Sequence, residues 1–230
     1  MKVISIQGQN IVRLKIVNDN LLCYHENGTT TSHNINGLEI LECWNNQLVS
    51  LPDLTNLGSL KIFGISINRL TSLPFLPDSL RVLNCSHNKL LYLPSLPHGL
   101  ETLYCSGNPI ISFPPFPTSL KVLGCCDMND SVILPPLPAG LEELECDRKQ
   151  LDTVSYIPDG LKKSYCYGVC NPHHVILLKQ HNDRCIQLGI KQSKTLPNLK
   201  TILEVKERHT LWSLRIDGEK YNNAFSLVQN

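Results

Sequence analysis

The sequence predicts a β-rich solenoid in which one short unit is stacked end to end. A motif of the form L-x-x-L-x-C-x-x-N-x-L recurs along the middle of the chain, with leading leucines at positions 38, 60, 80, 100, 120, 141 and 161. Each copy opens with alternating apolar and polar positions, which is the pattern of a half-buried strand. Most copies are followed by two closely spaced prolines, and these exclude a regular helix from the second half of the unit.

A period of about 20–29 residues with this lettering is the signature of leucine-rich repeats. We therefore expect a leucine-rich-repeat solenoid of about seven short strands. The strands should form a parallel sheet on the concave face, and the convex side should be extended and polyproline-II-like. Three regions follow from the pattern: an N-terminal β cap at 1–37, the solenoid at 38–170 and a C-terminal cap of mixed helix and strand at 171–230.

Both ends of an open stack expose core side chains, so both ends need a cap. In the first region, β-rich segments at 3–6, 11–17 and 21–24 are separated by Gly8 and by the polar run 18–20, and residues 27–32 are predicted to be a mobile loop. The segment 11–21 could be a loose first copy of the repeat. In the last region, Asn171-Pro172 is typical of a helix start, which predicts a helix near 172–188. A β-hairpin could follow within 211–228.

Two columns of residues are predicted to hold the solenoid together. The cysteine column should fill the core as small apolar side chains, since free cysteine is among the most buried residue types. The asparagine column should satisfy backbone groups where the chain leaves each strand. The structural residues are Cys43, Cys85, Cys105, Cys125 and Cys146, with Cys166 as a last copy, and Asn46, Asn68, Asn88 and Asn108. Met128 and Lys149 replace the asparagine later in the chain, so we expect the later turns to be held less well.

The outward strand positions give the best candidate for a functional surface. An aliphatic row on a solvent-facing sheet has no core to fill, and exposed contiguous apolar surface tends to mark a binding site. Aromatic side chains beside it are of the type that dominates protein interfaces. The predicted partner-binding residues are Ile40, Glu42, Trp44, Ile62, Val82, Asn84, Thr102, Tyr104, Val122, Glu143, Glu145, Tyr165 and Tyr167. The row could also reflect plain β-propensity with cross-strand packing, or a terminal segment could fold over it.

Composition narrows the function classes. The chain has 230 residues, 42% of them hydrophobic, and a formal net charge of +1, which gives no long-range attraction to nucleic acid or to an anionic membrane. We find no apolar run long enough for a signal peptide or a membrane span, and we expect the 10 cysteines to stay reduced in a cytoplasm. We expect a monomer that binds a partner protein and needs no cofactor.

Catalytic and metal-binding motifs are weak. The sequence has no nucleophile elbow and no glycine-rich phosphate loop. Cys166, Cys170 and His173 have spacing that zinc sites use, but a second half-site is lacking and Cys166 belongs to the core column. A zinc-dependent or cysteine-dependent enzyme therefore stays a minor alternative, and a zinc site is not expected.

The string L-P-x-L-P-x-x-L-x-x-L-x-C-x-x-N-x-L resembles the short repeats of bacterial effectors injected into host cells, and also repeats encoded by large DNA viruses of amoebae. The resemblance covers about residues 38 to 166 and implies binding to a host protein, in which case the cytoplasm is that of the host. Some of those effectors carry a ubiquitin-ligase domain with a catalytic Cys-x-Asp, which Cys125-Cys126-Asp127 matches in letters but inside a repeat. We predict a non-catalytic interaction module; the alternative is an adaptor whose C-terminal region recruits a ubiquitin-ligase component.

Overall fold

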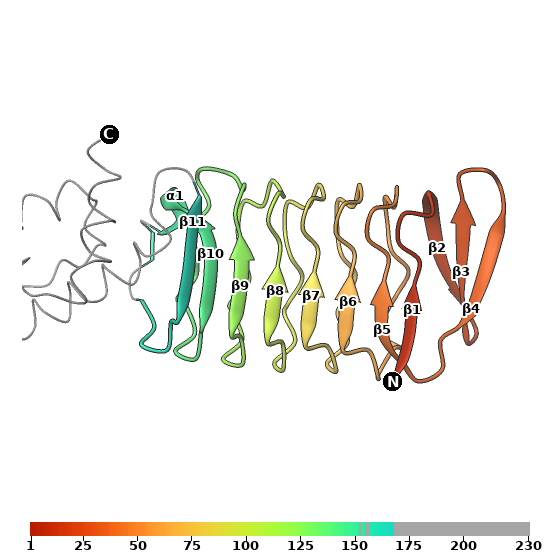
Figure 1. Cartoon of the computed structure of the whole chain (residues 1–230), viewed down its shortest axis with the longest axis horizontal. Coiled ribbons are helices and arrows are strands. Elements are labelled where there is room, and N and C mark those ends of the chain that lie inside the picture. The colour runs from red at the N-terminus through yellow and green to blue at the C-terminus, as the bar shows by residue number, and fades with distance from the viewer. Residues whose placement is uncertain (152, 155–156, 168–230) are drawn as a thin grey trace, which may run out of the picture.

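The computed structural model describes residues 1–151, 153–154 and 157–167, and these form an elongated stack of strands with one turn of repeat behind each strand (Figure 1). The stack is one eight-stranded sheet with the order β1-β5-β6-β7-β8-β9-β10-β11. Its strands are β1 (Lys2–Ser5), β5 (Leu38–Glu42), β6 (Ile62–Gly64), β7 (Val82–Asn84), β8 (Thr102–Tyr104), β9 (Val122–Cys125), β10 (Glu143–Asp147) and β11 (Lys163–Tyr167). The predicted helix and hairpin of the C-terminal cap, at 171–230, lie outside the described residues.

All neighbouring strands of this sheet run parallel, as a chain of identical units requires. Leu83 of β7 pairs with Phe63 of β6 and with Leu103 of β8, so equivalent motif positions are in register along the sheet. The predicted parallel-sheet solenoid is confirmed. Among the described residues the only helix is α1 (Arg148–Leu151), so the return limbs are not helical. Their polyproline-II conformation stays a prediction. No described helix is long and apolar enough to cross a membrane.

The first strand of the sheet comes from the region that we expected to be only a cap. β1 pairs in parallel with β5, and Ile6 donates its backbone N–H to Glu42 O at 2.8 Å. Ile4, Ile6, Gln9 and Ile11 occupy the motif positions of Leu41, Cys43, Asn46 and Leu48, as their shared pairing shows. The sheet therefore has one more strand than the seven expected, because residues 1–11 form a repeat without its leucines.

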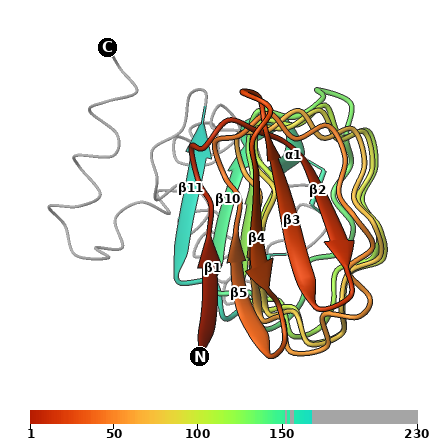
Figure 2. The same cartoon turned by 90° about the vertical axis from the view of Figure 1, so that its right-hand side faces the viewer.

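A second sheet covers the N-terminal end of the stack. It consists of β2 (Ile11–Val17), β3 (Asn20–His25) and β4 (Thr30–Asn34), which pair antiparallel in that order. Seen along the stack, these three strands lie across its end (Figure 2). Leu14, Leu21 and Cys23 join the main core from this sheet, so it buries the apolar end that an open stack would expose. Two predictions are wrong here: 11–21 is a hairpin rather than a repeat, and residues 30–32 belong to a strand rather than to a mobile loop.

The core runs along the whole stack between the sheet and the return limbs. Leu83, Leu103 and Leu123 have no exposed surface, and neither do the cysteines of the column from Cys43 to Cys146. Ile6 and Ile65 fill the same column in the two repeats that lack the cysteine. The column thus tolerates an aliphatic side chain, which agrees with packing as its role.

The asparagine column forms a ladder that ties each turn to the one before it. Asn88 donates from Nδ2 to the carbonyls of Cys85 in its own repeat and Ile65 in the preceding repeat, both at 3.0 Å. Its Oδ1 accepts the backbone N–H of Leu70 at 3.0 Å. The same three contacts recur at Asn46, Asn68 and Asn108. One amide thereby satisfies backbone groups of two turns where the ladder of the sheet ends.

The residue before each asparagine has a left-handed backbone. The φ angle is +56° at Asn45, +55° at Ile67, +53° at His87 and +66° at Gly107, and the equivalent Gly8 and Asp127 share it. This conformation is routine for glycine and tolerated by asparagine, but it is strained for a β-branched side chain. Ile67 is therefore the poorest fit in the column.

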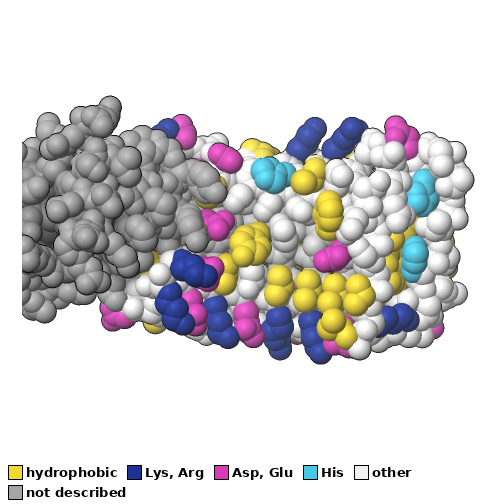
Figure 3. Space-filling model, viewed as in Figure 1, with side chains coloured by type: hydrophobic (Ala, Val, Ile, Leu, Met, Phe, Trp, Pro, Cys, Tyr) yellow, Lys and Arg dark blue, Asp and Glu magenta, His cyan; other side chains and the backbone are white. Residues whose placement is uncertain are grey.

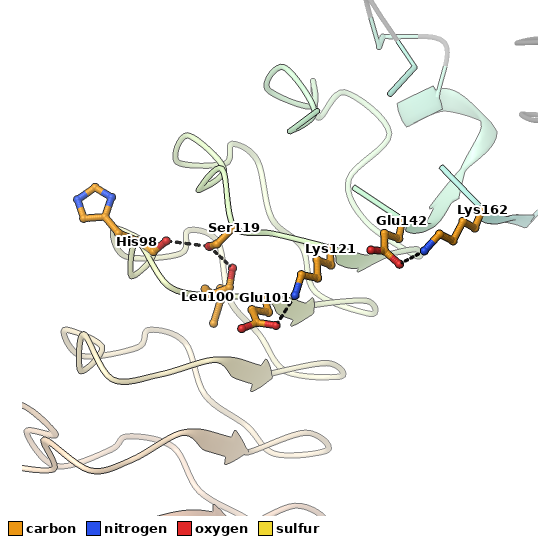
Figure 4. A network of polar contacts seen from close by, with 7 residues as sticks. All are labelled: His98, Leu100, Glu101, Ser119, Lys121, Glu142 and Lys162. Atoms are coloured by element: carbon orange, nitrogen blue, oxygen red, sulfur yellow. Dashed lines mark hydrogen bonds and ion pairs between the residues drawn. The ribbon is translucent and has the colours of Figure 1, made fainter. Parts of the chain in front are cut away.

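The prolines mark a tight turn that leads into each strand. The N–H groups of Leu80, Leu100 and Leu120 each donate to a proline carbonyl three residues earlier, at 3.0 Å. Ser119 Oγ lies within hydrogen-bond distance of two carbonyls of the preceding repeat, 2.7 Å from His98 O and 2.6 Å from Leu100 O (Figure 4). Serine and proline together thus fix how the chain enters the next strand.

A row of charged side chains runs along the edge where the strands begin. Lys121 Nζ lies 2.9 Å from Glu101 Oε2 and Lys162 Nζ lies 2.7 Å from Glu142 Oε2, each joining neighbouring repeats (Figure 4). Lys61 pairs in the same way with Glu39 at 2.6 Å. These pairs are exposed and therefore stabilise little. They give the edge alternating charge, which Figure 3 shows along the lower rim of the molecule.

Candidate functional site

The candidate site lies on the solvent-facing side of the eight-stranded sheet, which we call the sheet face. Side chains of β5 to β10 form three columns there, because the same strand position faces outward in every repeat. The first column is aliphatic from Ile40 through Ile62 to Val82, and Val122 continues it beyond Thr102. These side chains are half-buried. Figure 3 shows hydrophobic side chains gathered over β5 to β7.

β1 lengthens this aliphatic row by one member. Val3 pairs with Ile40 and is 48% exposed, which is more than any of the half-buried row members predicted from the sequence. The sequence signal was present in the alternation of residues 3–6. It was missed because those residues were assigned to a separate cap.

A groove of about 490 Å³ lies beside this row, where β6 to β9 end. Its floor is the third column, where Ser66, Ser86, Ser106 and Cys126 present small side chains. Trp44, 36% exposed, and Asp147 hold the same column position in the repeats before and after. The groove forms because the side chains of this column are small in four successive repeats, whereas the side chains on either side of the column are larger. Its walls are Asn84, Tyr104 and Glu145 on one side and Ile67, His87 and Asp127 on the other.

Tyr104 is the largest side chain in the groove wall, and Gly124 makes room for it. A Cβ atom built on Gly124 would lie 2.6 Å from Tyr104 Cδ1, so the phenol ring lies against the backbone of the next strand. Burial raises the pKa of Tyr104, and the carboxylates of Glu145 and Glu143 raise it further. The ring therefore stays protonated and lies in a negative field.

Ser86 lies on the floor of the groove and is only 8% exposed. Its backbone N–H donates to Asn84 Oδ1 at 3.2 Å, but its hydroxyl has no hydrogen-bond partner among the described residues. By contrast, the hydroxyl of Ser106 accepts the N–H of Cys126 at 3.0 Å. The Ser86 hydroxyl is not among the fully buried atoms that lack a partner, so it is open to the groove, where a ligand can bond to it.

The C-terminal end of the groove is acidic. Asp127 and Glu145 line it, and Asp147 lies beside it, accepting the Asp127 N–H at 2.7 Å. Burial raises the pKa of Asp147, and the charges of Asp127 and Asp130 raise it too. Glu143, in the first column, forms a 2.7 Å ion pair with Lys163. Carboxylates thus outnumber basic groups on the described part of the sheet face, although the whole chain is nearly neutral.

The cysteines of the repeats are poorly placed for chemistry. Burial raises the pKa of Cys85 to about 12, and it raises those of Cys105 and Cys125 well above the usual value. Cys126 faces the groove but is 5% exposed, and burial together with Asp147 and Glu145 raises its pKa to about 12. Since the thiolate is the reactive form, the triplet at 125–127 lacks an activated nucleophile.

Among the described residues, no three side chains of His, Cys, Asp and Glu are grouped so that they could hold a metal ion. Cys170 and His173, whose spacing in the sequence is one that zinc sites use, lie outside the described residues, and so does the side chain of Cys166. The side chains of Tyr165 and Tyr167 also lie outside them, although the backbones of both residues pair with β10. The other predicted partner-binding residues are brought together on the sheet face, within the three columns.

Comparison with known proteins gave matches among solved structures alone. No protein-family model matches the chain, and no curated protein matches it. YopM from Yersinia enterocolitica WA-314 is 30% identical over 56% of this chain, with a TM-score of 0.44. The leucine-rich effector YopM from Yersinia pestis is 28% identical over 57% of this chain, also with a TM-score of 0.44. A Shigella effector LRR domain is 31% identical over 57% of this chain, with a TM-score of 0.46.

The matched region spans 32% and 48% of the two YopM chains and 68% of the Shigella domain. The likeness thus covers less than half of each YopM chain. The fold class stands on the chain's own features: the repeat lettering, the parallel sheet in register and the asparagine ladder. On these features the chain has the leucine-rich-repeat fold.

Proposed function

We propose that this chain is a non-catalytic protein-interaction module that binds a partner protein through its sheet face. The observation that carries the proposal is the aliphatic row beside a groove, on a sheet face that no other described element covers. Extended surfaces of repeat proteins commonly serve in this way. The contacts would come from the predicted partner-binding residues, with Val3, Ser86 and Asp127 added.

Two aromatic residues are the expected anchors of the interface. Tyr104 lines the groove, and Trp44 holds the column position of Ser66 one repeat earlier; such residues often contribute most of the binding energy. The buried cysteines and the absence of a grouped metal site among the described residues favour binding over catalysis. We place the action in a cytoplasm, of the producing cell or of a host.

The test is affinity capture from a candidate cytosol with the full-length chain and two matched tyrosine variants. Tyr104→Ala removes a side chain of the sheet face, and Tyr92→Ala removes one that is 56% exposed on the return limb. We expect proteins retained by the unaltered chain and by Tyr92→Ala to be lost with Tyr104→Ala, by about tenfold or more. Equal retention by all three would show that the sheet face is not the contact surface.

A further inference from the structure

We propose that the groove on the sheet face receives an extended peptide segment of the partner that carries an arginine or lysine at the acidic end. The inference rests on the proposed function, because it specifies which chemistry the partner must offer. Three independent features of the groove support it: its length, a hydroxyl on its floor and the charge at one end.

The groove has the dimensions of a short extended peptide. It crosses four strands, and neighbouring strands lie about 4.8 Å apart, so it is roughly 14 Å long. An extended chain advances about 3.3 Å per residue, so about four residues fit along it. A segment lying there would run across the strands of the sheet.

Ser86 offers a contact to the backbone of such a segment. Its hydroxyl lies near the middle of the floor and has no partner among the described residues. An extended peptide presents a backbone N–H or carbonyl at each residue, and these are obligatory hydrogen-bonding groups. A hydrogen bond between the Ser86 hydroxyl and one of these backbone groups would give each of them a partner.

The acidic end selects a basic side chain. Asp127 and Glu145 line the groove next to the ring of Tyr104, so a cation placed there meets two carboxylates and an aromatic face. The two groups lie side by side, because a Cβ atom built on Gly124 would lie 2.6 Å from Tyr104 Cδ1 and 3.5 Å from Glu145 Oε2. At the opposite end, Ile67 lines the groove and offers apolar surface, and Trp44 is exposed one repeat earlier in the sequence. The preferred segment is therefore apolar at one end and basic at the other.

The experiment selects displayed random 12-residue peptides on the immobilised full-length chain and then measures their affinities by titration. We expect the selected peptides to contain arginine or lysine a few residues from an apolar side chain. Glu145→Gln and Asp127→Asn should each weaken them about tenfold, and asparagine suits the left-handed backbone at 127. Ser86→Ala should also weaken binding, whereas the exposed Ser72→Ala, on the return limb, should leave it unchanged.

The outcomes separate this inference from the proposed function. Ile62→Glu serves as the test of the face itself, because it places a charge in the aliphatic row. Peptides that need Ile62 but show no basic preference and tolerate Glu145→Gln would overturn the inference and leave the function standing. If the selected peptides tolerate Ile62→Glu and Tyr104→Ala, or if none is selected, both are overturned.

Discussion

Asparagine at one position of four successive repeats satisfies backbone groups where the strand ends; the residues are Asn46, Asn68, Asn88 and Asn108. Asn88 is buried, and its amide contacts three backbone groups in two turns. Loss of the amide would leave those groups unsatisfied in the core.

Asn88→Ala should therefore lower the free energy of unfolding by about 2–3 kcal/mol. Asn84→Ala is the matched control, because Asn84 is only half-buried and accepts a single bond, from Ser86. We expect the control to change the free energy of unfolding by roughly 0.5 kcal/mol or less. Urea unfolding of both variants measures the difference, and equal effects would contradict the ladder.

The left-handed position before the asparagine gives a prediction of opposite sign. Ile67→Asn should raise the free energy of unfolding by about 1 kcal/mol, because asparagine adopts this backbone more readily and Ile67 is 49% exposed. At the equivalent position, Gly107→Ala should lower it, since the new Cβ would clash with His87 and the φ of +66° disfavours alanine. Thermal unfolding of the two variants tests this, and a destabilised Ile67→Asn would refute it.

At the scale of the element, the ladder stops where Met128 replaces asparagine. Met128 packs against the core but has no amide to offer to the turns on either side. Asn129 does not take over, because its Oδ1 accepts the N–H of Ser131 within its own loop.

Met128→Asn should extend the ladder by one rung. The new amide would accept the N–H of Ile110, which corresponds to Leu90 in the preceding repeat, and stability should rise by about 1 kcal/mol. Hydrogen exchange at the Ile110 amide should slow in the variant. Faster exchange there would mean that the packing of methionine outweighs the added bonds.

The repeats from 38 onward could be predicted from the sequence, because leucine, cysteine and asparagine recur at fixed spacing. β1 could not, since Ile4 and Ile6 take the strand pairing of the motif without its leucine and cysteine, and Gln9 stands at the asparagine position, where its backbone N–H donates to Asn46 Oδ1. The left-handed column also escaped prediction, because Asn45, Ile67 and His87 share a backbone conformation but no residue type.

The sheet face could be predicted in part. Alternation along each strand identified its columns, including the aliphatic row. The groove could not be predicted, because it depends on the relative sizes of the side chains in three columns at once. Ser86, with its unpartnered hydroxyl, looked like any other polar strand residue.

At the scale of the whole molecule, a continuous core with a column of buried cysteines makes stability depend on keeping those thiols protonated. The folded pKa of Cys85 is about 12, raised from 9.0 by burial. A raised folded pKa means that the unfolded chain loses its thiol protons first. This part of the stability is therefore complete below about pH 9 and falls as the pH rises from 9 toward 12.

Urea unfolding at pH 8 and at pH 10 measures this effect. The free energy of unfolding should fall between the two, and it should fall less in Cys85→Ala, which removes one titrating thiol while lowering stability at both pH values. Cys85→Ala keeps every lysine and tyrosine, so the titration of those groups contributes equally in both proteins and does not affect the comparison. An identical alkaline loss in both proteins would contradict the assignment.

The central claim is that the partner contacts the sheet face, and radical footprinting of side chains in the complex with a captured partner tests it most directly. Oxidation of Trp44 and Tyr104 should fall on binding, whereas Tyr92 and Phe75, which are 56% and 75% exposed on the return limb, should stay as reactive as in the unbound chain. Protection of Tyr92 and Phe75 with unchanged Trp44 and Tyr104 would contradict the claim.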